Sequence, residues 1–148
     1  MIRVQEHPFE VGAELAALTA GRIDVGALAS FVGLVRVHGR APITAMTLEH
    51  YPGMTEKKLA EIELEANARW ALQASLIVHR YGRMLPGEPI VLVATVAAHR
   101  APALEACAFL IDWLKTKAPF WKLEETAGAS QWVEARADDD AAAARWQS

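Results

Sequence analysis

Apolar residues recur along this chain with two different spacings. Over Thr55–Leu72 they return every three or four residues, which predicts an amphipathic helix. A second long helix is expected over Pro102–Ala118, and Pro119 ends it because the residue before a proline avoids the helical conformation. The apolar face of this second helix is predicted to consist of Leu104, Cys107, Ala108, Ile111 and Leu114. A shorter helix is expected over Val11–Thr19.

Other segments have the length and composition of strands. The predicted strands are Ile2–Gln5, Leu28–Arg36, Ile43–His50, Ser75–His79, Ile90–Ala98, Phe120–Glu125 and Gln131–Glu134. The turn-rich segment His38–Pro42 separates the second and third of these and predicts a hairpin-like pair. Gly82, Pro86 and Gly87 predict a turn before Ile90. The tail from Asp138 to Ser148 is expected to be helical or frayed.

This order of elements predicts an α+β fold in which helices pack on a largely antiparallel sheet. A length of 148 residues is about that of one ordinary domain, and no internal repeat or linker is visible. We therefore expect a single domain over residues 1–148.

The composition is that of a globular protein, with 53% hydrophobic and 22% charged residues. No segment approaches the roughly 20 apolar residues of a membrane helix. The N-terminus carries charge and Pro8 where a signal peptide would be apolar, so a cytoplasmic location and no membrane association are expected. The single cysteine, Cys107, excludes an internal disulfide and is interpreted as a core residue.

The net charge of −3 conceals an uneven distribution. Acidic residues concentrate in Glu56–Glu65 and Glu134–Asp140. The cations of the intervening segments are Arg36, Arg40, Arg80, Arg83, Arg100, Lys115, Lys117 and Lys122. If folding brings some of them together, they form a site for a small anion, because nucleic-acid binding usually requires a broadly basic surface. The alternative is a scatter of surface charges.

Lys115 and Lys122 bracket an apolar, aromatic turn that contains Pro119. Bulky neighbours exclude water, and both desolvation and a second nearby cation lower the pKa of a lysine. One lysine could then act as a neutral base or nucleophile while the other stays charged. The alternative is that Lys115 complements the helix dipole and Lys122 is an ordinary surface cation.

His99 and Arg100 lie where a buried strand ends and the next helix begins, a common place for ligand-binding groups. The planar guanidinium of arginine suits a phosphate, and Arg36 is a further candidate; surface positions are the alternative. No phosphate-binding Gly-rich loop, dinucleotide motif or nucleophile elbow is present. The five histidines are too scattered to predict a metal site.

Several motifs together resemble one known family, the large, catalytic subunits of molybdopterin synthase, from about Phe9 to Trp146. They are Phe31-x-Gly33-x-Val35-Arg36, Leu48-Glu49-His50-Tyr51-Pro52-Gly53-Met54, His79-Arg80-x-Gly82, Pro86-Gly87-Glu88, Ala98-His99-Arg100 and the run Asp112–Lys122. The ordered set is far more specific than any one of its members.

The resemblance implies an α/β-hammerhead-like fold and an enzyme that transfers sulfur to cyclic pyranopterin monophosphate, forming the molybdopterin dithiolene. The donor would be the C-terminal Gly-Gly thiocarboxylate of a small, ubiquitin-like sulfur-carrier subunit. A homodimer is implied, and a heterotetramer with that subunit. No permanently bound cofactor, metal or nucleic acid is expected.

The resemblance also assigns site residues. Lys115 and Lys122 would be catalytic. The substrate-binding residues would be Leu34, Val35, Arg36, His99, Arg100, Lys115, Lys122, Leu123 and Glu124. Two positions depart from the family pattern: Leu104 replaces a phenylalanine, with an expected effect on core packing, and Leu123 replaces a common basic residue, which weakens the local positive field.

Two other functions compete with the enzyme. A non-catalytic adaptor would keep the fold and bind the tail of a ubiquitin-like protein. A regulatory domain that binds nucleotide or phosphate is disfavoured by the acidic balance and by the missing phosphate loop. The presence of both lysines favours the enzyme.

Overall fold

The computed structural model describes residues 1–39, 42–133 and 137–147, and within these ranges it has four helices and eight strands. Arg40 and Ala41 of the predicted turn, Glu134 of the last predicted strand, and Ser148 lie outside the described residues.

The first sheet has the strand order β1-β4-β6-β2. Its strands are β1 (Ile2–Gln5), β4 (Leu72–Arg80), β6 (Pro89–Ala97) and β2 (Ala27–Leu34). β1 runs parallel to β4, and the other neighbours are antiparallel. β4 and β6 are buried on both faces, which explains their continuous apolar runs.

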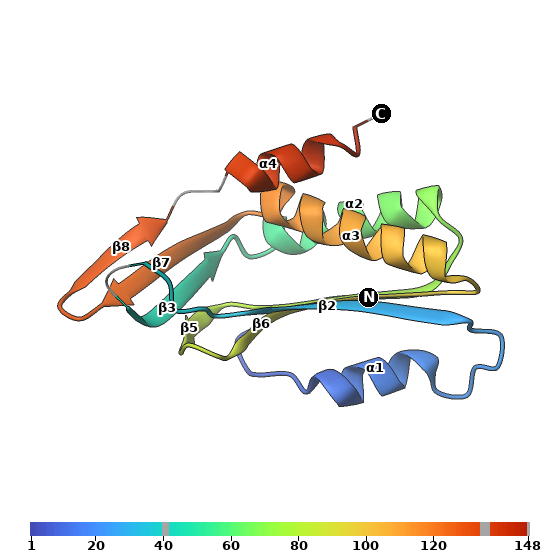
Figure 1. Ribbon diagram of the computed structural model, residues 1–148, viewed down its shortest axis with the longest axis horizontal. Helices are drawn as coiled ribbons and strands as arrows, with labels where there is room; N and C mark the ends of the chain where they lie inside the picture. The colour runs from blue at the N-terminus through green and yellow to red at the C-terminus, as the bar shows by residue number, and fades with distance from the viewer. Residues whose placement is uncertain (40–41, 134–136, 148) are drawn as a thin grey trace.

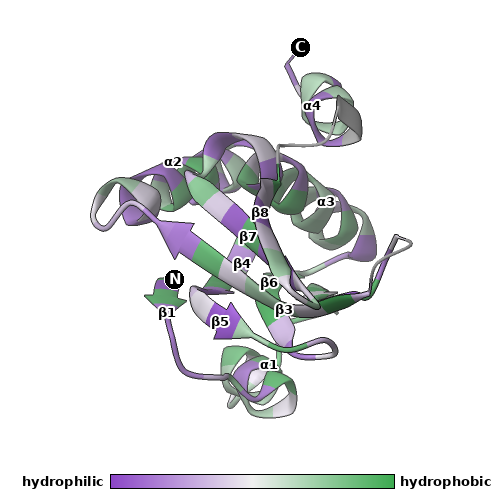
Figure 2. Cartoon of the chain, turned by 90° about the vertical axis from the view of Figure 1, so that its left-hand side faces the viewer, coloured by the Kyte–Doolittle hydropathy of each residue, from purple (hydrophilic) through white to green (hydrophobic). Residues whose placement is uncertain are grey.

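Helices cover both faces of this sheet (Figures 1 and 2). α2 (Met54–Arg69) and α3 (Arg100–Lys117) lie on one face, and α1 (Val11–Thr19) lies on the other. The predicted apolar face of α2 is confirmed, because Leu59, Ile62 and Ala66 are all buried in the main core. α4 (Ala137–Ala144) packs on the outer side of α3 through Ala143.

The core face of α3 differs in part from the predicted one. The buried residues of this helix are Ala103, Ala106, Cys107, Phe109, Leu110, Trp113 and Leu114. Leu104 is 59% exposed, so the expectation that it affects core packing is wrong. Cys107 is buried, as expected, and burial raises the pKa of its thiol to about 11. A thiol with so high a pKa is a packing group and a poor nucleophile.

The second sheet is antiparallel throughout and has the order β5-β3-β7-β8. Its strands are β5 (Gly82–Met84), β3 (Ile43–His50), β7 (Phe120–Thr126) and β8 (Ala129–Val133). β7 and β8 form a hairpin around Gly128, whose φ of 86° is costly for residues other than glycine. A small cluster of Val35, Met46, Leu48 and Met84 joins this sheet to the first through Ile90.

The predicted α+β fold class is confirmed, but the strands divide into two sheets. The expected hairpin of Leu28–Arg36 with Ile43–His50 is wrong: β2 pairs with β6 in one sheet, and β3 pairs with β5 and β7 in the other. The short strand β5 was not expected from the sequence. No helix in the described ranges is long and apolar enough to cross a membrane.

Candidate functional site

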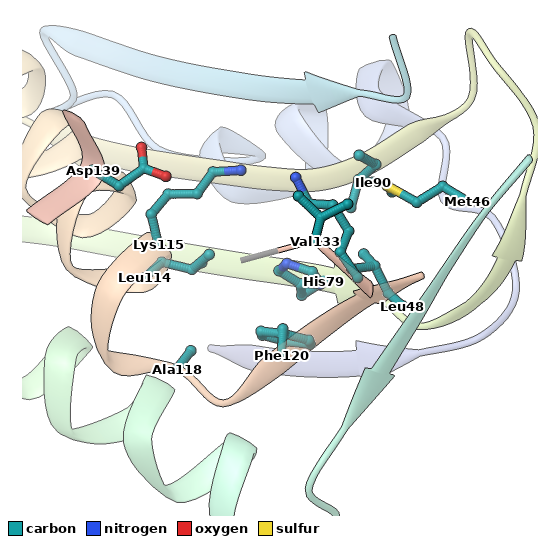
Figure 3. Close-up of a pocket in the computed structure, with 11 residues that line it drawn as sticks. Met46, Leu48, His79, Ile90, Leu114, Lys115, Ala118, Phe120, Val133 and Asp139 are labelled. Carbon is teal, nitrogen blue, oxygen red and sulfur yellow. The ribbon is translucent and has the colours of Figure 1, made fainter. Parts of the chain in front are cut away.

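A cavity of ≈ 130 Å³ lies where the C-terminal end of α3 meets the second sheet (Figure 3). Its walls come from both sheets and from α3 and α4. The lining residues are Met46, Leu48, His79, Ile90, Leu114, Lys115, Ala118, Phe120, Lys122, Val133 and Asp139. Most of them are apolar, but Lys115 is exposed and Lys122 is half-buried, so the polar groups lie between apolar walls and solvent.

Lys115 reaches the cavity from the last turn of α3, which ends at Lys117 before Pro119. Figure 3 shows its side chain extending from the helix into the cavity. The negative end of the helix dipole is close to this position and favours an ammonium group there.

Lys122 reaches the same cavity from β7. Side chains alternate between the two faces of a strand, so Phe120, Lys122 and Glu124 share one face of the second sheet. Lys122 is paired with Leu48 on β3 and with Val133 on β8, and both partners also line the cavity. The turn at Pro119 therefore brings the two predicted lysines to one site.

His79 forms part of the cavity wall although its side chain is only 4% exposed. Its Nδ1–H donates a hydrogen bond to the carbonyl oxygen of Arg80, at 2.8 Å in the tautomer that this acceptor requires. The ring stacks on Phe120, with centroids 3.7 Å apart and 16° between the planes. Burial lowers the pKa of His79 to about 3, and the positive charges of Lys115 and His50 lower it further, against the opposing effect of the backbone hydrogen bond.

Asp139 brings a carboxylate to the cavity from α4. Figure 3 shows the Asp139 and Lys115 side chains at the same end of the cavity. The polar lining of the described residues thus combines two ammonium groups, one neutral imidazole and one carboxylate. Such a set attracts an anion and can also hold an amine in a defined position.

Of the predicted residues Leu34, Val35 and Arg36, Val35 alone packs behind the cavity wall. Val35 is 4% exposed and packs with Met46 and Leu48, which line the cavity. Leu34 and Arg36 on either side of it are exposed.

Leu123 and Glu124 point to opposite faces of β7, because side chains alternate along a strand. Leu123 lies on the opposite face of β7 from Lys122 and is paired with Trp132. Glu124 shares the face of Lys122, accepts a hydrogen bond at 2.8 Å from His38 Nε2, and lines a neighbouring hollow of ≈ 270 Å³. Sequence reasoning did not anticipate the pairing with His38.

His99 and Arg100 lie far from the lysines within one chain. His99 caps the N-terminus of α3, Arg100 is its first residue, and both are exposed. Lys115 follows Arg100 by fifteen residues on the same helix, which at about 1.5 Å per residue separates them by roughly 22 Å. A single chain therefore gathers Lys115 and Lys122 but leaves this predicted pair at the other end of the helix.

His79 and Asp139 are cavity residues that the sequence reasoning did not select. His79 continues a stripe with Ser75 and Ile77 on one face of β4, so a polar residue at the end of a buried stripe was the available signal. Asp139 carried no such signal, because it belongs to an alanine-rich tail. In the part of the chain that the structure describes, no group of three His, Cys, Asp or Glu residues could hold a metal ion.

Comparison with known proteins identifies the family of the chain. The family model described as MoaE protein matches residues 4–117. The chain is 53% identical to the molybdopterin synthase catalytic subunit of Ralstonia nicotianae over 146 residues, which is 98% of this chain and 83% of that protein. It is 51% identical to the Escherichia coli protein of the same name, covering 98% of this chain and 97% of the other.

Solved structures give the same result. A molybdopterin biosynthesis MoaE protein from Burkholderia ambifaria superposes with a TM-score of 0.86 at 53% identity, covering 100% of this chain and 98% of that one. Molybdopterin synthase from Staphylococcus aureus superposes with a TM-score of 0.83 at 29% identity, covering 89% of this chain and 96% of that one. The chain belongs to the MoaE family, the catalytic subunits of molybdopterin synthase.

Proposed function

We propose that this chain transfers sulfur from the C-terminal thiocarboxylate of a small sulfur-carrier subunit to cyclic pyranopterin monophosphate, forming the dithiolene of molybdopterin. The observation that carries the proposal is the convergence of Lys115 and Lys122 on one cavity that is otherwise lined mostly by apolar residues, in a chain of the MoaE family. A non-catalytic adaptor would have no need of two ammonium groups in such a cavity.

The cavity suits the charges of this reaction. The thiocarboxylate and the cyclic phosphate are both anionic, and the intermediates formed during transfer carry negative charge. Cations held in fixed positions beside apolar walls stabilise such charge more strongly than freely reorienting water does. Each transfer leaves an ordinary carboxylate on the carrier, so water supplies the oxygen that replaces each sulfur. Two transfers give the two sulfurs of the dithiolene.

The small subunit would deliver its sulfur through an extended tail. The donor atom is on the last residue of that tail and must reach a cavity of ≈ 130 Å³. A Gly-Gly end fits a narrow passage because glycine has no side chain to clash with the walls. The pterin is then a substrate that binds and dissociates in each turnover, and the chain needs no permanently bound cofactor.

A second copy of the chain would complete the site. His99 and Arg100 lie roughly 22 Å along α3 from Lys115, too far to touch a substrate held at the lysines of the same chain. A homodimer in which each copy presents the N-terminus of α3 to the partner's lysine cavity would bring the predicted substrate-binding residues together. With one small subunit on each copy, the assembly would be a heterotetramer.

Reconstitution tests the proposed reaction. The chain is mixed with a thiocarboxylated small subunit and the pterin precursor, and dithiolene product is quantified. Lys115→Ala should lower the rate by about 10²–10³-fold or more, because it removes a cation that contacts the reacting groups. Lys122→Ala should also slow the reaction severely, with some activity left if its role is electrostatic.

Lys117→Ala is the matched control. Lys117 is on the same helix but lies over the ring of Trp113, at 5.0 Å, outside the lysine cavity. The Lys117→Ala protein should form dithiolene at close to the wild-type rate. A folded Lys115→Ala protein with wild-type turnover would refute the proposed role of this lysine.

A further inference from the structure

His79 is a buried, titratable side chain in the cavity wall to which the proposed chemistry assigns no role. Buried histidines in a core usually have both ring nitrogens satisfied by the surrounding protein. The ring of His79 instead borders a cavity that contains the amines of Lys115 and Lys122. Whether its Nε2 carries a proton therefore affects how these amines are held.

The surroundings of His79 fix its tautomer. Nδ1 must carry the proton, because it lies 2.8 Å from the carbonyl oxygen of Arg80, which can only accept. Nε2 is then left with a lone pair and can only accept a hydrogen bond. Stacking on Phe120, with 16° between the planes, holds the ring against rotation.

Burial and two of its neighbours keep the ring neutral. Lys115 on α3 and His50 on β3 repel a positive charge on the ring, while Lys122 on β7 and Asp139 on α4 line the same cavity. With its pKa lowered to about 3, mainly by burial and then by Lys115, His79 stays uncharged from pH 5 to 8. Lys115 and His79 line the same cavity of ≈ 130 Å³, so the amine can approach the ring.

We propose that His79 is a positioning residue whose Nε2 accepts a hydrogen bond from the amine of Lys115. This bond engages one N–H and directs the others toward the cavity. A cationic residue at the same place would repel the ammonium group, whereas a neutral ring with a fixed lone pair holds it. The catalytic consequence rests on the proposed sulfur transfer, but the hydrogen bond itself does not.

Nitrogen NMR on the intact chain tests the hydrogen bond without any assay of activity. From pH 5 to 8 the His79 signals should be those of a neutral ring with Nδ1 protonated and Nε2 bare. Lys115→Met should shift the Nε2 signal and leave Nδ1 in place, whereas the control Lys117→Met should shift neither. A protonated Nε2, or an Nε2 signal indifferent to Lys115→Met, would overturn the proposal.

Two substitutions then separate positioning from a purely structural role. His79→Gln places an acceptor where Nε2 was but loses the bond to Arg80. His79→Asn keeps a donor near Nδ1 but has no acceptor in the cavity. Positioning predicts that His79→Asn lowers kcat by about tenfold or more with little change in KM, because a charge-assisted hydrogen bond is lost, and that His79→Gln retains most of kcat.

The reverse order, an active His79→Asn and a slow His79→Gln, would assign His79 a structural role and refute positioning. Absence of sulfur transfer by the wild-type protein would refute the proposed function instead. The NMR result would still stand in that case, so the two failures can be told apart.

Discussion

Lys115 and Lys117 are two residues apart on α3 but occupy different surroundings. Successive helical residues turn by about 100°, so two positions apart they point to nearly opposite sides. Lys115 faces the cavity between α3 and the second sheet, whereas Lys117 stacks over Trp113 on the α2 side. The difference in role follows from helix geometry, since the residue type is the same.

The burial of His79 has a measurable effect on stability. Its pKa falls from the ordinary 6.5 to about 3 in the folded chain, so between these values the unfolded chain binds a proton that the folded chain does not. Stability therefore decreases as the pH falls through this window. Between pH 7 and pH 5 the contribution of His79 to the free energy of unfolding should drop by about 2 kcal/mol.

Urea denaturation at the two pH values measures this drop. His79→Leu is the comparison, because it removes the titrating group and keeps an apolar side chain at the position. The variant should lose less stability than wild type from pH 7 to pH 5, by about 2 kcal/mol. Equal losses in both proteins would mean that His79 protonates readily when folded, which would also contradict its neutral state in the cavity.

At the scale of elements, local patterns predicted most helices and strands but not how the strands pair. α2, α3 and the strands β4 and β6 were anticipated, since each has a clear periodicity or apolar run. The pairing of β2 with β6, and of β3 with β7, joins segments far apart in the sequence. No local pattern encodes such partners. β5 has only three residues, too few for a period to appear.

The site residues also divide into those that local sequence could bring together and those that only tertiary packing does. Lys115 and Lys122 could be predicted to meet because a single proline turn joins their elements. The separation of His99 and Arg100 from them could have been read from the length of the predicted helix. That His79 and Lys115 line one cavity depends on how β4 packs beneath α3, which is tertiary information.

Gly26 controls the junction between β2 and the segment that leads into α3. A Cβ atom at this position would lie 1.9 Å from the carbonyl oxygen of Ala98, a distance at which the backbone must move. Gly26→Ala should therefore destabilise the fold by about 2–3 kcal/mol and displace His99, as in other overpacked sites. Thermal or urea denaturation measures the loss.

Gly12→Ala is the control for this substitution. Gly12 lies in α1, and its Cβ would meet only the side chain of Glu10, at 3.2 Å, which is flexible. Alanine favours a helix over glycine by up to about 1 kcal/mol, so this variant should be as stable as wild type or slightly more stable. A Gly26→Ala protein as stable as Gly12→Ala would show that the Ala98 segment adapts freely.

At the scale of the whole molecule, the length of α3 makes a dimer necessary for the proposed site, in which Arg100 and Lys115 contact the same substrate. Arg100 and Lys115 at opposite ends of one helix cannot serve the same small substrate within one chain. Light scattering should therefore show a dimer at micromolar concentration. Arg100→Ala and Lys115→Ala should each be inactive alone, when assayed with substrate below its KM, because each removes one half of every site.

Mixing these two inactive proteins gives the decisive measurement. After subunit exchange, half of the dimers contain one copy of each variant, and in these one of the two sites has both Arg100 and Lys115. Activity should return to roughly a quarter of the wild-type value. A mixture of Lys115→Ala with Lys122→Ala is the control and should gain no activity over the separate variants, because both lysines belong to the same half of the site. If both mixtures stay inactive although exchange is complete, the substrate does not bridge two copies, and Arg100 lies outside the site.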